Sequence, residues 1–366
     1  MRPRISENQI RLLVASGASA GHLYPAIAFA QSIILKNPRA EVAFVSSRRG
    51  GMEENIKAAG FPVFLISIRP LQFNFLGFLR FLYSFFLSFL QTFLIIEKFR
   101  PNLAAGFGSY ISFPVILEAA LFKRSTVIHE QNVVLGRANR FLSWFADKIA
   151  VSFRETAISG DKVNFIGYPL RQSLAKVSRG QALGFFGLED KFTVLVLGGS
   201  QGSKRINENF KQALPYLGEK NDFQFIHISG KNDYSWLKNY YSCITINNRL
   251  FDFLSPMHFA YSLADIVVCR SGAGTISELA YFNKAAILIP YPYAGGHQLE
   301  NALVLEKDKA AVVIEENKLS AGALAENISR LIRSPDERRL LETNIRKFAV
   351  PDADRRLADL ALSLVD

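Results

Sequence analysis

The stretch that most constrains the fold of this chain runs over residues 265–302, DIVVCRSGAGTISELAYFNKAAILIPYPYAGGHQLENA. A short apolar run at 266–269 is followed by a small-residue turn, a helical pattern from Thr275 and a second apolar run at 285–289. Gly and Pro residues bound these segments. In an open parallel sheet such a turn lies at the carboxyl edge of the strands, where backbone N–H groups and the helix dipole attract anions. The pattern therefore predicts a phosphate-binding edge.

Two residues of this helix have two readings. Thr275 and Glu278 have the spacing of a capping box, in which Thr275 is the N-cap and Glu278 the N3 residue. The alternative is contact with a ligand, because polar side chains recur in the next loop at His297, Gln298 and Asn301. A ligand with both phosphate and hydroxyl groups would fit such an edge, and the spacing alone leaves both readings open.

The rest of the chain repeats the same unit. Short apolar runs alternate with longer helical patterns over residues 11–166 and again from residue 192, which is typical of α/β domains with doubly wound parallel sheets. Each series opens with a strand that runs into a small-residue turn, GASAGH at 17–22 and GGSQGS at 198–203. We expect the carboxyl edges of both sheets to face a common cleft that forms the binding site.

The domain boundaries follow from a break in this pattern. Residues 167–170, Gly-Tyr-Pro-Leu, precede a polar stretch, and a length of 366 residues suits two domains. We expect a first domain at 1–168, a second at 169–345 and a separate last helix at 346–366.

The charge of the chain favours an anionic partner. The formal net charge is +11, and the basic residues are scattered rather than gathered in an arm. An anionic membrane surface or phosphorylated ligands are therefore favoured over nucleic acid, which we do not expect as a partner. The two cysteines have no CxxC or Cys/His spacing, so neither a disulfide framework nor a zinc site is expected, and a reducing cytoplasm is the default.

One segment, FNFLGFLRFLYSFFLSFLQTFLII at 73–96, is apolar on all sides. Its uncharged part at 81–96 is shorter than the ~20 residues that span a bilayer, and it lies between two strands of one domain. The alternatives are a buried helix or a helix that lies in the membrane interface, and nearby basic residues such as Arg80 favour the interface. The side chains expected to enter the membrane are Phe73, Phe75, Phe78, Phe81, Phe85 and Phe89.

Seven sequence blocks together identify a family. GASAGHLYPAIAFA, GFGSYISFP, HEQNVVLGRAN, GYPLR, GGSQGSKRIN, CRSGAGTISE and HQLENALVLEK resemble, in order, the motif series of the MurG family within glycosyltransferase family 28. Neither G-x-G-x-x-G nor the P-loop pattern occurs, so a nicotinamide enzyme or P-loop enzyme is weakly supported. The resemblance implies a GT-B fold, with a last helix that returns to the first domain. It further implies a peripheral enzyme at the cytoplasmic face of the cell membrane.

The resemblance also implies the reaction. Members of this family are inverting transferases that move N-acetylglucosamine from UDP-GlcNAc to undecaprenyl-diphospho-N-acetylmuramoyl-pentapeptide (lipid I), which gives lipid II for peptidoglycan synthesis. Carried over by motif, the donor contacts are Ser19, Ala20, Gly21, Asn132, Arg171, Ser200, Leu254, Ala273, Gly274, Thr275, Glu278 and Gln298. The acceptor contacts are Gly108, Tyr110 and Asn139. We expect no cofactor and no metal, so helix dipoles and Arg171 would neutralise the diphosphate.

The first turn departs from the family pattern. The family has Gly-Gly-Thr-Gly-Gly-His where this chain has Gly-Ala-Ser-Ala-Gly-His at 17–22. Ala does not easily adopt a positive φ, so either Ala18 and Ala20 are right-handed or the turn is reshaped.

The candidate catalytic residues are His22, His129 and Glu130. His22 follows the first turn at the mouth of a helix, and we expect it to be the general base that takes the proton of the attacking hydroxyl. His129 and Glu130 end a strand at the same edge and would take over this role if His22 does not have it. Arg270 ends a buried strand and should have a partner, whereas His227 lies within an apolar strand and is expected to be a core residue.

Other functions remain possible from the sequence. A UDP-GlcNAc 2-epimerase or another lipid glycosyltransferase would share the fold and the donor turns, although an epimerase needs no lipid-facing helix. A non-enzyme alternative is a membrane-associated UDP-sugar sensor, which would not need His22.

Overall fold

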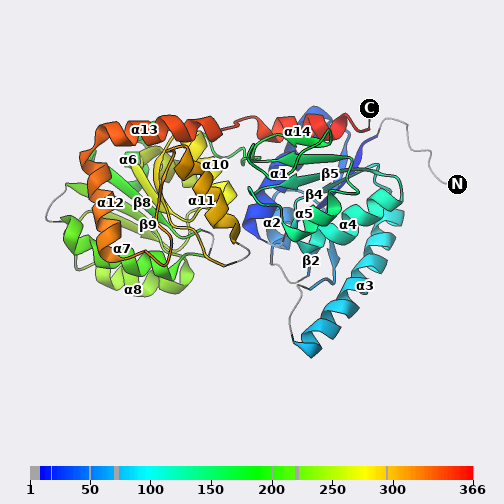
Figure 1. The fold of residues 1–366 in the computed structure, drawn as a ribbon, viewed down its shortest axis with the longest axis horizontal. Coiled ribbons are helices and arrows are strands. Elements are labelled where there is room, and N and C mark those ends of the chain that lie inside the picture. The colour runs from blue at the N-terminus through cyan, green and yellow to red at the C-terminus, as the bar shows by residue number, and fades with distance from the viewer. Residues whose placement is uncertain are drawn as a thin grey trace. The chain divides into compact units, whose positions relative to one another are not determined.

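The computed structural model describes residues 9–17, 19–48, 51–69, 74–199, 201–218, 222–293 and 296–365. The chain forms two compact units (Figure 1). Unit 1 contains residues 1–171 and 350–366, and unit 2 contains residues 172–349. The chain therefore passes from unit 1 to unit 2 after Arg171 and returns at Val350, a few residues later in each case than the sequence pattern suggests. Each unit is described below by itself.

Unit 1 is built on a seven-stranded parallel sheet in the order β3-β2-β1-β4-β5-β6-β7. The five inner strands are largely buried, as their continuous apolar runs predict, whereas the edge strands β3 and β7 are mostly half-buried. They are β1 (Arg11–Ala15), β2 (Glu41–Ser47), β3 (Val63–Ile66), β4 (Leu103–Gly106), β5 (Ser125–Glu130), β6 (Lys148–Val151) and β7 (Val163–Phe165). The helices are α1 (Ala20–Lys36), α2 (Glu53–Ala58), α3 (Phe75–Phe99), α4 (Ser109–Leu121), α5 (Arg137–Leu142) and α14 (Ala353–Leu362).

Unit 2 repeats this topology with a six-stranded parallel sheet in the order β10-β9-β8-β11-β12-β13. Its strands are β8 (Phe192–Leu197), β9 (Phe223–Ile228), β10 (Asn248–Phe251), β11 (Ile266–Cys269), β12 (Ala285–Leu288) and β13 (Val312–Val313). Its helices are α6 (Arg179–Phe186), α7 (Lys204–Gly218), α8 (Lys231–Tyr241), α9 (Met257–Leu263), α10 (Ala273–Phe282), α11 (His297–Lys307), α12 (Ala321–Arg333) and α13 (Pro335–Ile345). The expected doubly wound parallel sheets are therefore present in both halves.

The last helix, α14, completes the core of unit 1. Leu357, Ala358 and Ala361 are buried in the same cluster as residues of β1, β2 and α1. Ser32 Oγ of α1 donates a hydrogen bond to Asp354 at 2.5 Å, and Lys36 pairs with Asp359 at 2.7 Å. The C-terminal segment thus packs as an integral part of the first sheet's helical layer.

Helix α3 is unusual within this fold. It extends over 25 residues, and 28% of its most apolar window is buried. By length and composition alone it could cross a membrane, the one helix in the described part of the chain of which this is true. Figure 1 shows α3 (cyan) beside α4, with its first turns extending past the rest of unit 1. The fold therefore uses only a small part of this helix's surface.

Candidate active site

The strand order defines where a ligand would bind in each unit. In unit 1 the chain winds outward in both directions from the adjacent strands β1 and β4, and in unit 2 from β8 and β11. Such a switch point leaves a crevice at the carboxyl ends of the two strands. The turns that follow these four strands contain most of the predicted site residues.

The β1–α1 turn contains Ser19, Ala20, Gly21 and His22. Ser19 is the N-cap of α1, and its Oγ is hydrogen-bonded to His22 Nδ1 at 2.7 Å. Ala20 is the first residue of α1 and does not have a positive φ, so the change from glycine causes no strain there. Ala18 lies outside the described residues. Gly17 has φ +119°, and a Cβ there would lie 2.3 Å from Ser46 Oγ, so this position requires glycine.

The β4–α4 turn brings Gly108 beside His22 and Asn139. A Cβ on Gly108 would lie 3.4 Å from His22 Nε2 and 3.5 Å from Asn139 Nδ2. Gly108 has φ +76°, and the next residue, Ser109, is one of the few non-glycine residues with positive φ, at +65°. Strain of this kind is concentrated at functional sites. Tyr110 is half-buried and packs on the core beneath α4. His22, Gly108 and Asn139, all predicted site residues, therefore lie close together.

Glu130 organises the loop after β5. Its Oε1 accepts hydrogen bonds from the backbone N–H and the side-chain amide of Asn132, at 3.0 and 3.3 Å. Its Oε2 accepts from the Gly136 N–H and from Asn139 Nδ2, each at 2.9 Å. Four donors from its own loop surround this buried carboxylate, which favours a positioning role over catalysis.

His129 is also buried and has both ring nitrogens occupied. Gln131 Nε2 donates to Nδ1 at 3.0 Å, so Nε2 carries the proton and donates to the Gly167 carbonyl at 3.1 Å. Burial lowers the pKa of His129 to about 4, so the ring is neutral at pH 7. The expectation of a catalytic His129 is not supported by this geometry, because the ring is buried among its own partners.

Asn139 is the residue of this cluster with unused hydrogen-bonding capacity. It is buried on α5, and its Nδ2 donates to the His129 carbonyl and to Glu130. Its Oδ1 is buried without a hydrogen-bond partner among the described residues. A buried amide oxygen is an acceptor that a bound hydroxyl or N–H group can satisfy.

Arg171 ends unit 1 and is half-buried. Its guanidinium lies 4.5 Å from the centre of the Tyr24 ring on α1, in a cation–π contact. The hinge arginine is therefore held over the helix that carries His22.

The β8–α7 turn of unit 2 packs backbone against backbone. A Cβ on Gly202 would lie 2.2 Å from the Ser229 carbonyl oxygen, so only glycine fits. Ser200 lies outside the described residues. Beneath this turn His227 is buried between the Tyr241 hydroxyl at 2.6 Å and Asn207 Oδ1 at 2.9 Å. Burial lowers the pKa of His227 to about 3, and the expectation of a core histidine is confirmed.

The capping-box reading of Thr275 and Glu278 is wrong. Helix α10 begins at Ala273 with Gly272 as its N-cap, so Ala273, Gly274 and Thr275 form its first turn. Glu278 lies one turn further on, half-buried, and its Oε2 accepts a hydrogen bond from the Tyr261 hydroxyl at 2.8 Å. The carboxylate is thus held by a neighbouring helix, and its contact with a ligand stays a prediction.

Other predicted residues of unit 2 surround the same edge. Leu254 is buried in the segment between β10 and α9. Gln298 Oε1 accepts from the Tyr291 N–H at 3.1 Å, and its carbonyl accepts from Ser271 Oγ at 2.8 Å. These contacts attach α11 to the turn after β11.

Arg270 has the partner that its burial requires. It forms an ion pair with Glu316 and donates to the Ile289 and Pro290 carbonyls at 3.1 and 3.2 Å and to Ser203 Oγ at 2.8 Å. This network joins the turns after β8, β11 and β12, so Arg270 is structural.

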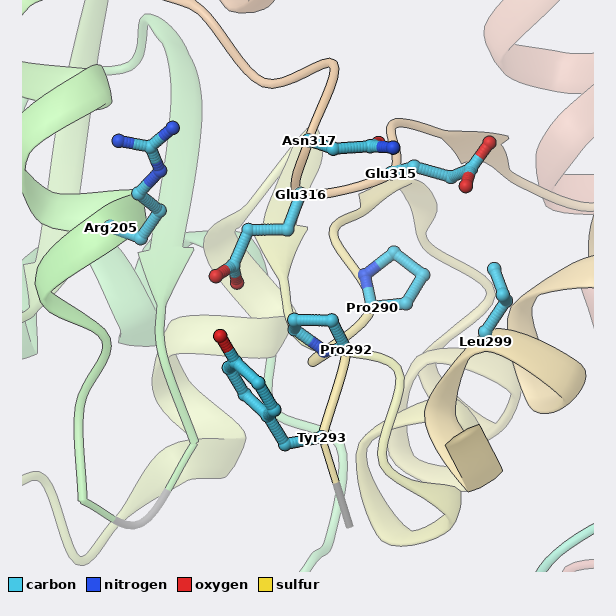
Figure 2. A pocket seen from close by; sticks show the side chains of 8 residues that line it. All are labelled: Arg205, Pro290, Pro292, Tyr293, Leu299, Glu315, Glu316 and Asn317. Carbon is cyan, nitrogen blue, oxygen red and sulfur yellow. The ribbon is translucent and has the colours of Figure 1, made fainter. Parts of the chain in front are cut away.

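A pocket lies beside this network (Figure 2). Together with the open solvent at its mouth it has a volume of about 910 Å³, and it is lined by Arg205, Pro290, Pro292, Tyr293, Leu299, Glu315, Glu316 and Asn317. In Figure 2 the Tyr293 hydroxyl and the Glu316 carboxylate point toward each other, whereas the guanidinium of Arg205, on α7, points away from both. None of the predicted donor contacts lines it, and in the described ranges no group of three His, Cys, Asp or Glu residues could hold a metal ion.

Sequence reasoning missed Tyr261. Its ring is buried on α9, and its hydroxyl fixes Glu278. A tyrosine at an apolar position of a predicted helix needs a partner for its hydroxyl, and that requirement was the available signal.

Comparison with known proteins identifies the family. The glycosyltransferase family 28 N-terminal domain matches residues 12–151 and its C-terminal domain matches residues 193–357. A protein of Thermodesulfovibrio yellowstonii, named UDP-N-acetylglucosamine–N-acetylmuramyl-(pentapeptide) pyrophosphoryl-undecaprenol N-acetylglucosamine transferase, is 36% identical over 97% of this chain and 99% of its own length. A protein of Myxococcus xanthus with the same name is 34% identical over 97% of this chain and 93% of its own.

Solved structures with the same fold include both transferases and epimerases. The crystal structure of Acinetobacter baumannii MurG has a TM-score of 0.80 at 24% identity, covering 97% of this chain and 99% of that one. UDP-GlcNAc 2-epimerase from Neisseria meningitidis has a TM-score of 0.69 at 14% identity, covering 97% and 100%. The expected GT-B architecture is confirmed. The chain belongs to glycosyltransferase family 28 and, within that class, to the MurG family of N-acetylglucosamine transferases.

Proposed function

We propose that the chain transfers N-acetylglucosamine from UDP-GlcNAc to undecaprenyl-diphospho-N-acetylmuramoyl-pentapeptide and so makes lipid II. The observation that carries this proposal is the identity of 36% over nearly the full length of a relative with this activity in its name. The epimerases resemble the chain in fold alone, at 14% identity or less.

Unit 2 supplies most of the donor contacts in this proposal. The first turn of α10 at Ala273, Gly274 and Thr275 presents backbone N–H groups and the positive end of a helix dipole to the diphosphate. Glu278 binds the ribose hydroxyls, and Tyr261 holds its carboxylate in place for them. Leu254 and Gln298 contact the nucleotide and the sugar. Of the remaining predicted contacts, Ser19, Ala20, Gly21, Asn132 and Arg171 belong to unit 1.

His22 is the general base in this proposal. In this role Nδ1–H donates to Ser19 Oγ, and Nε2 takes the proton of the attacking hydroxyl of the acceptor. The hydroxyl oxygen bonds to the anomeric carbon, the bond from that carbon to the diphosphate breaks, and UDP leaves with the electron pair. Gly108 makes room for the acceptor beside Nε2, because any side chain there would occupy this space.

The acceptor is held by the residues around Glu130. Asn139 Oδ1 is a buried hydrogen-bond acceptor to which the lipid substrate can donate a hydrogen bond. Glu130 fixes the positions of Asn139 and Asn132. Ser109 and Tyr110 at the start of α4 add a helix N-terminus beside this point. His129 supports the loop from below through Gln131 and Gly167.

The enzyme is peripheral on the cytoplasmic face of the membrane in this proposal. Helix α3 exposes large apolar side chains along its length, among them Phe75, Phe78, Tyr83, Phe86 and Leu90. A soluble surface seldom gathers so much apolar area, whereas an anionic lipid interface would cover it. Phe81, Phe85 and Phe89 are half-buried, and Phe85 and Phe89 pack against Phe113 of α4, so they anchor the helix rather than enter lipid. Phe73 lies outside the described residues.

Sugar transfer itself is the test. Radiolabelled UDP-GlcNAc incubated with a short-chain, water-soluble analogue of the lipid acceptor should yield labelled acceptor and one UDP for each sugar transferred. Conversion of the donor to its 2-epimer without acceptor would instead support an epimerase. Binding of UDP-GlcNAc without either reaction would support a UDP-sugar sensor.

A further inference from the structure

Helix α5 has two faces with different surroundings. Asn139 and Leu142 are buried, Asn139 against Glu130 and Leu142 in the core. On the other face Phe141 and, just beyond the helix, Trp144 are exposed, and Trp144 is 82% exposed. One short helix therefore joins the candidate acceptor site to the surface of unit 1.

The exposed side of α5 continues the apolar surface of α3. The Phe141 ring lies 5.0 Å from Phe113 of α4, and the Phe113 ring lies 5.7 Å from Phe85 of α3. These three rings form an unbroken aromatic path from α3 across α4 to α5. Trp144 extends the apolar surface at the α5 end.

The charges around this surface are mainly basic. Arg137 and Arg140 on α5 are exposed, as are Lys123 and Arg124 after α4 and Arg80 on α3. The exposed acidic residues of the same segments are Glu97 and Asp147, and Asp147 is bound to Thr126. A tryptophan beside arginines is typical of segments that lie at a membrane interface, and the excess of positive charge suits anionic lipid.

Glu130 connects this helix to the acceptor site. It accepts from the N–H of Gly136, the N-cap of α5, and from Asn139 Nδ2 in the first turn. At the other end the Ser143 N–H donates to the Asn139 carbonyl at 2.8 Å, one residue before Trp144. Any contact that holds Phe141 and Trp144 in place therefore also restricts the position of Asn139.

We propose that an anionic lipid surface takes up Phe141 and Trp144 and thereby holds Asn139 in its acceptor-binding position, so that membrane contact accelerates transfer. The inference rests on the proposed transferase function and adds to it a regulation of the same site by lipid. The acceleration does not depend on delivery of a lipid-anchored substrate, because α5 itself carries the contact.

The experiment measures transfer to the water-soluble acceptor with and without vesicles of phosphatidylglycerol. Transfer without vesicles tests the proposed function alone. Vesicles should raise kcat/KM of the wild-type enzyme for this acceptor. The change Trp144→Ser should leave the rate without vesicles unchanged, reduce partitioning into vesicles by about tenfold, the value for one aromatic side chain left in water, and abolish the acceleration even at saturating vesicles.

The matched control is Phe86→Ser on α3, where the side chain is 70% exposed. It should weaken vesicle binding to a similar extent but retain the full acceleration once vesicles saturate the enzyme. Equal acceleration in Trp144→Ser and the wild type would overturn the inference. A change of oligomeric state in Trp144→Ser, with unchanged vesicle binding, would also overturn it, because the surface would then bind a second copy of the chain.

Discussion

Helices α3 and α9 occupy the same topological position in the two units but differ in length and in burial. α3 leads from β3 to β4, and α9 leads from β10 to β11, so each precedes the strand beside the switch point. α9 has 7 residues, of which Ala260, Tyr261 and Leu263 are buried. α3 has 25 residues and leaves most of its aromatic side chains in solvent.

The difference separates what the fold needs from what the function needs. A single short helix is enough to make the crossover in unit 2, and Tyr261 on it holds the Glu278 carboxylate. The additional turns of α3 make no comparable contribution to the core of unit 1, and the membrane contact that we propose is the function assigned to them. In the proposed function, unit 1 therefore holds the lipid acceptor and the general base, and unit 2 holds most of the donor contacts.

The sharpest test of this division is the change His22→Ala in unit 1. Loss of a general base should lower kcat by about 10²–10⁴-fold and leave the donor KM nearly unchanged, because most of the proposed donor contacts lie in unit 2. Steady-state kinetics with both substrates varied measures this split. A variant that retains most of its kcat would remove His22 from the mechanism.

The double change Phe75→Ser and Phe86→Ser should have the next largest effect. The two side chains are 77% and 70% exposed, so their replacement should leave unit 1 folded. Since burial of one such side chain stabilises by about 1.5–3 kcal/mol, partitioning into anionic vesicles should fall by about 10²-fold or more. Co-sedimentation at several salt concentrations measures it. Leu340→Ser on α13 of unit 2 is the control and should not alter partitioning, and equal effects of the two variants would contradict the division.

The change Glu278→Ala should affect unit 2 alone. Loss of a charged hydrogen bond to ribose should raise the donor KM by about tenfold to a hundredfold with kcat little changed, because the contact is the same in ground and transition states. Tyr261→Phe removes only the hydroxyl that holds the carboxylate and should have a smaller effect in the same direction. A fall in kcat at unchanged KM in either variant would place Glu278 in the chemistry instead.

The smallest effect concerns a feature that the units share. Each has one buried, neutral histidine with a lowered pKa, about 4 for His129 and about 3 for His227. As the pH falls below about 6.5 the unfolded chain binds protons that the folded units do not, so stability decreases as the pH approaches these values. Between pH 7 and about pH 5.5 each unit should lose about 1 kcal/mol. Hydrogen exchange measured separately for β5 and β9 would detect the loss of stability. A loss in only one unit would show that the two histidines do not act alike.

Much of this organisation was predictable from the sequence because it depends on local patterns. The alternation of apolar runs and helices predicted both sheets, and the small-residue turns predicted the positions at the strand ends. The capping box failed because Gly272, with its extended backbone, is the N-cap of α10, three residues before Thr275. Sequence spacing identifies a possible cap but does not decide between two helix starts that lie within one turn of each other.

The contacts that assign roles to the site residues come from distant parts of the chain. His129 looked catalytic beside Glu130, but its ring is bound to the carbonyl of Gly167, 38 residues away. Glu278 depends on Tyr261 of the preceding helix, 17 residues earlier. By contrast, the hydrogen-bond partners of Glu130, which are Asn132, Gly136 and Asn139, all follow within 9 residues. Its role in holding this loop was therefore easier to predict from the sequence.

The packing of α14 against unit 1 has a consequence for synthesis on the ribosome. The core of unit 1 lacks Leu357, Ala358 and Ala361 until the codons of α14 have been translated, and the Leu364 carbonyl accepts the Ser125 Oγ hydrogen bond at 2.9 Å. Unit 2, which ends at Ala349, can complete its sheet while unit 1 is still unfinished. Unit 1, whose synthesis begins first, is therefore completed after unit 2. A premature stop codon within α14 would damage unit 1 while leaving unit 2 intact.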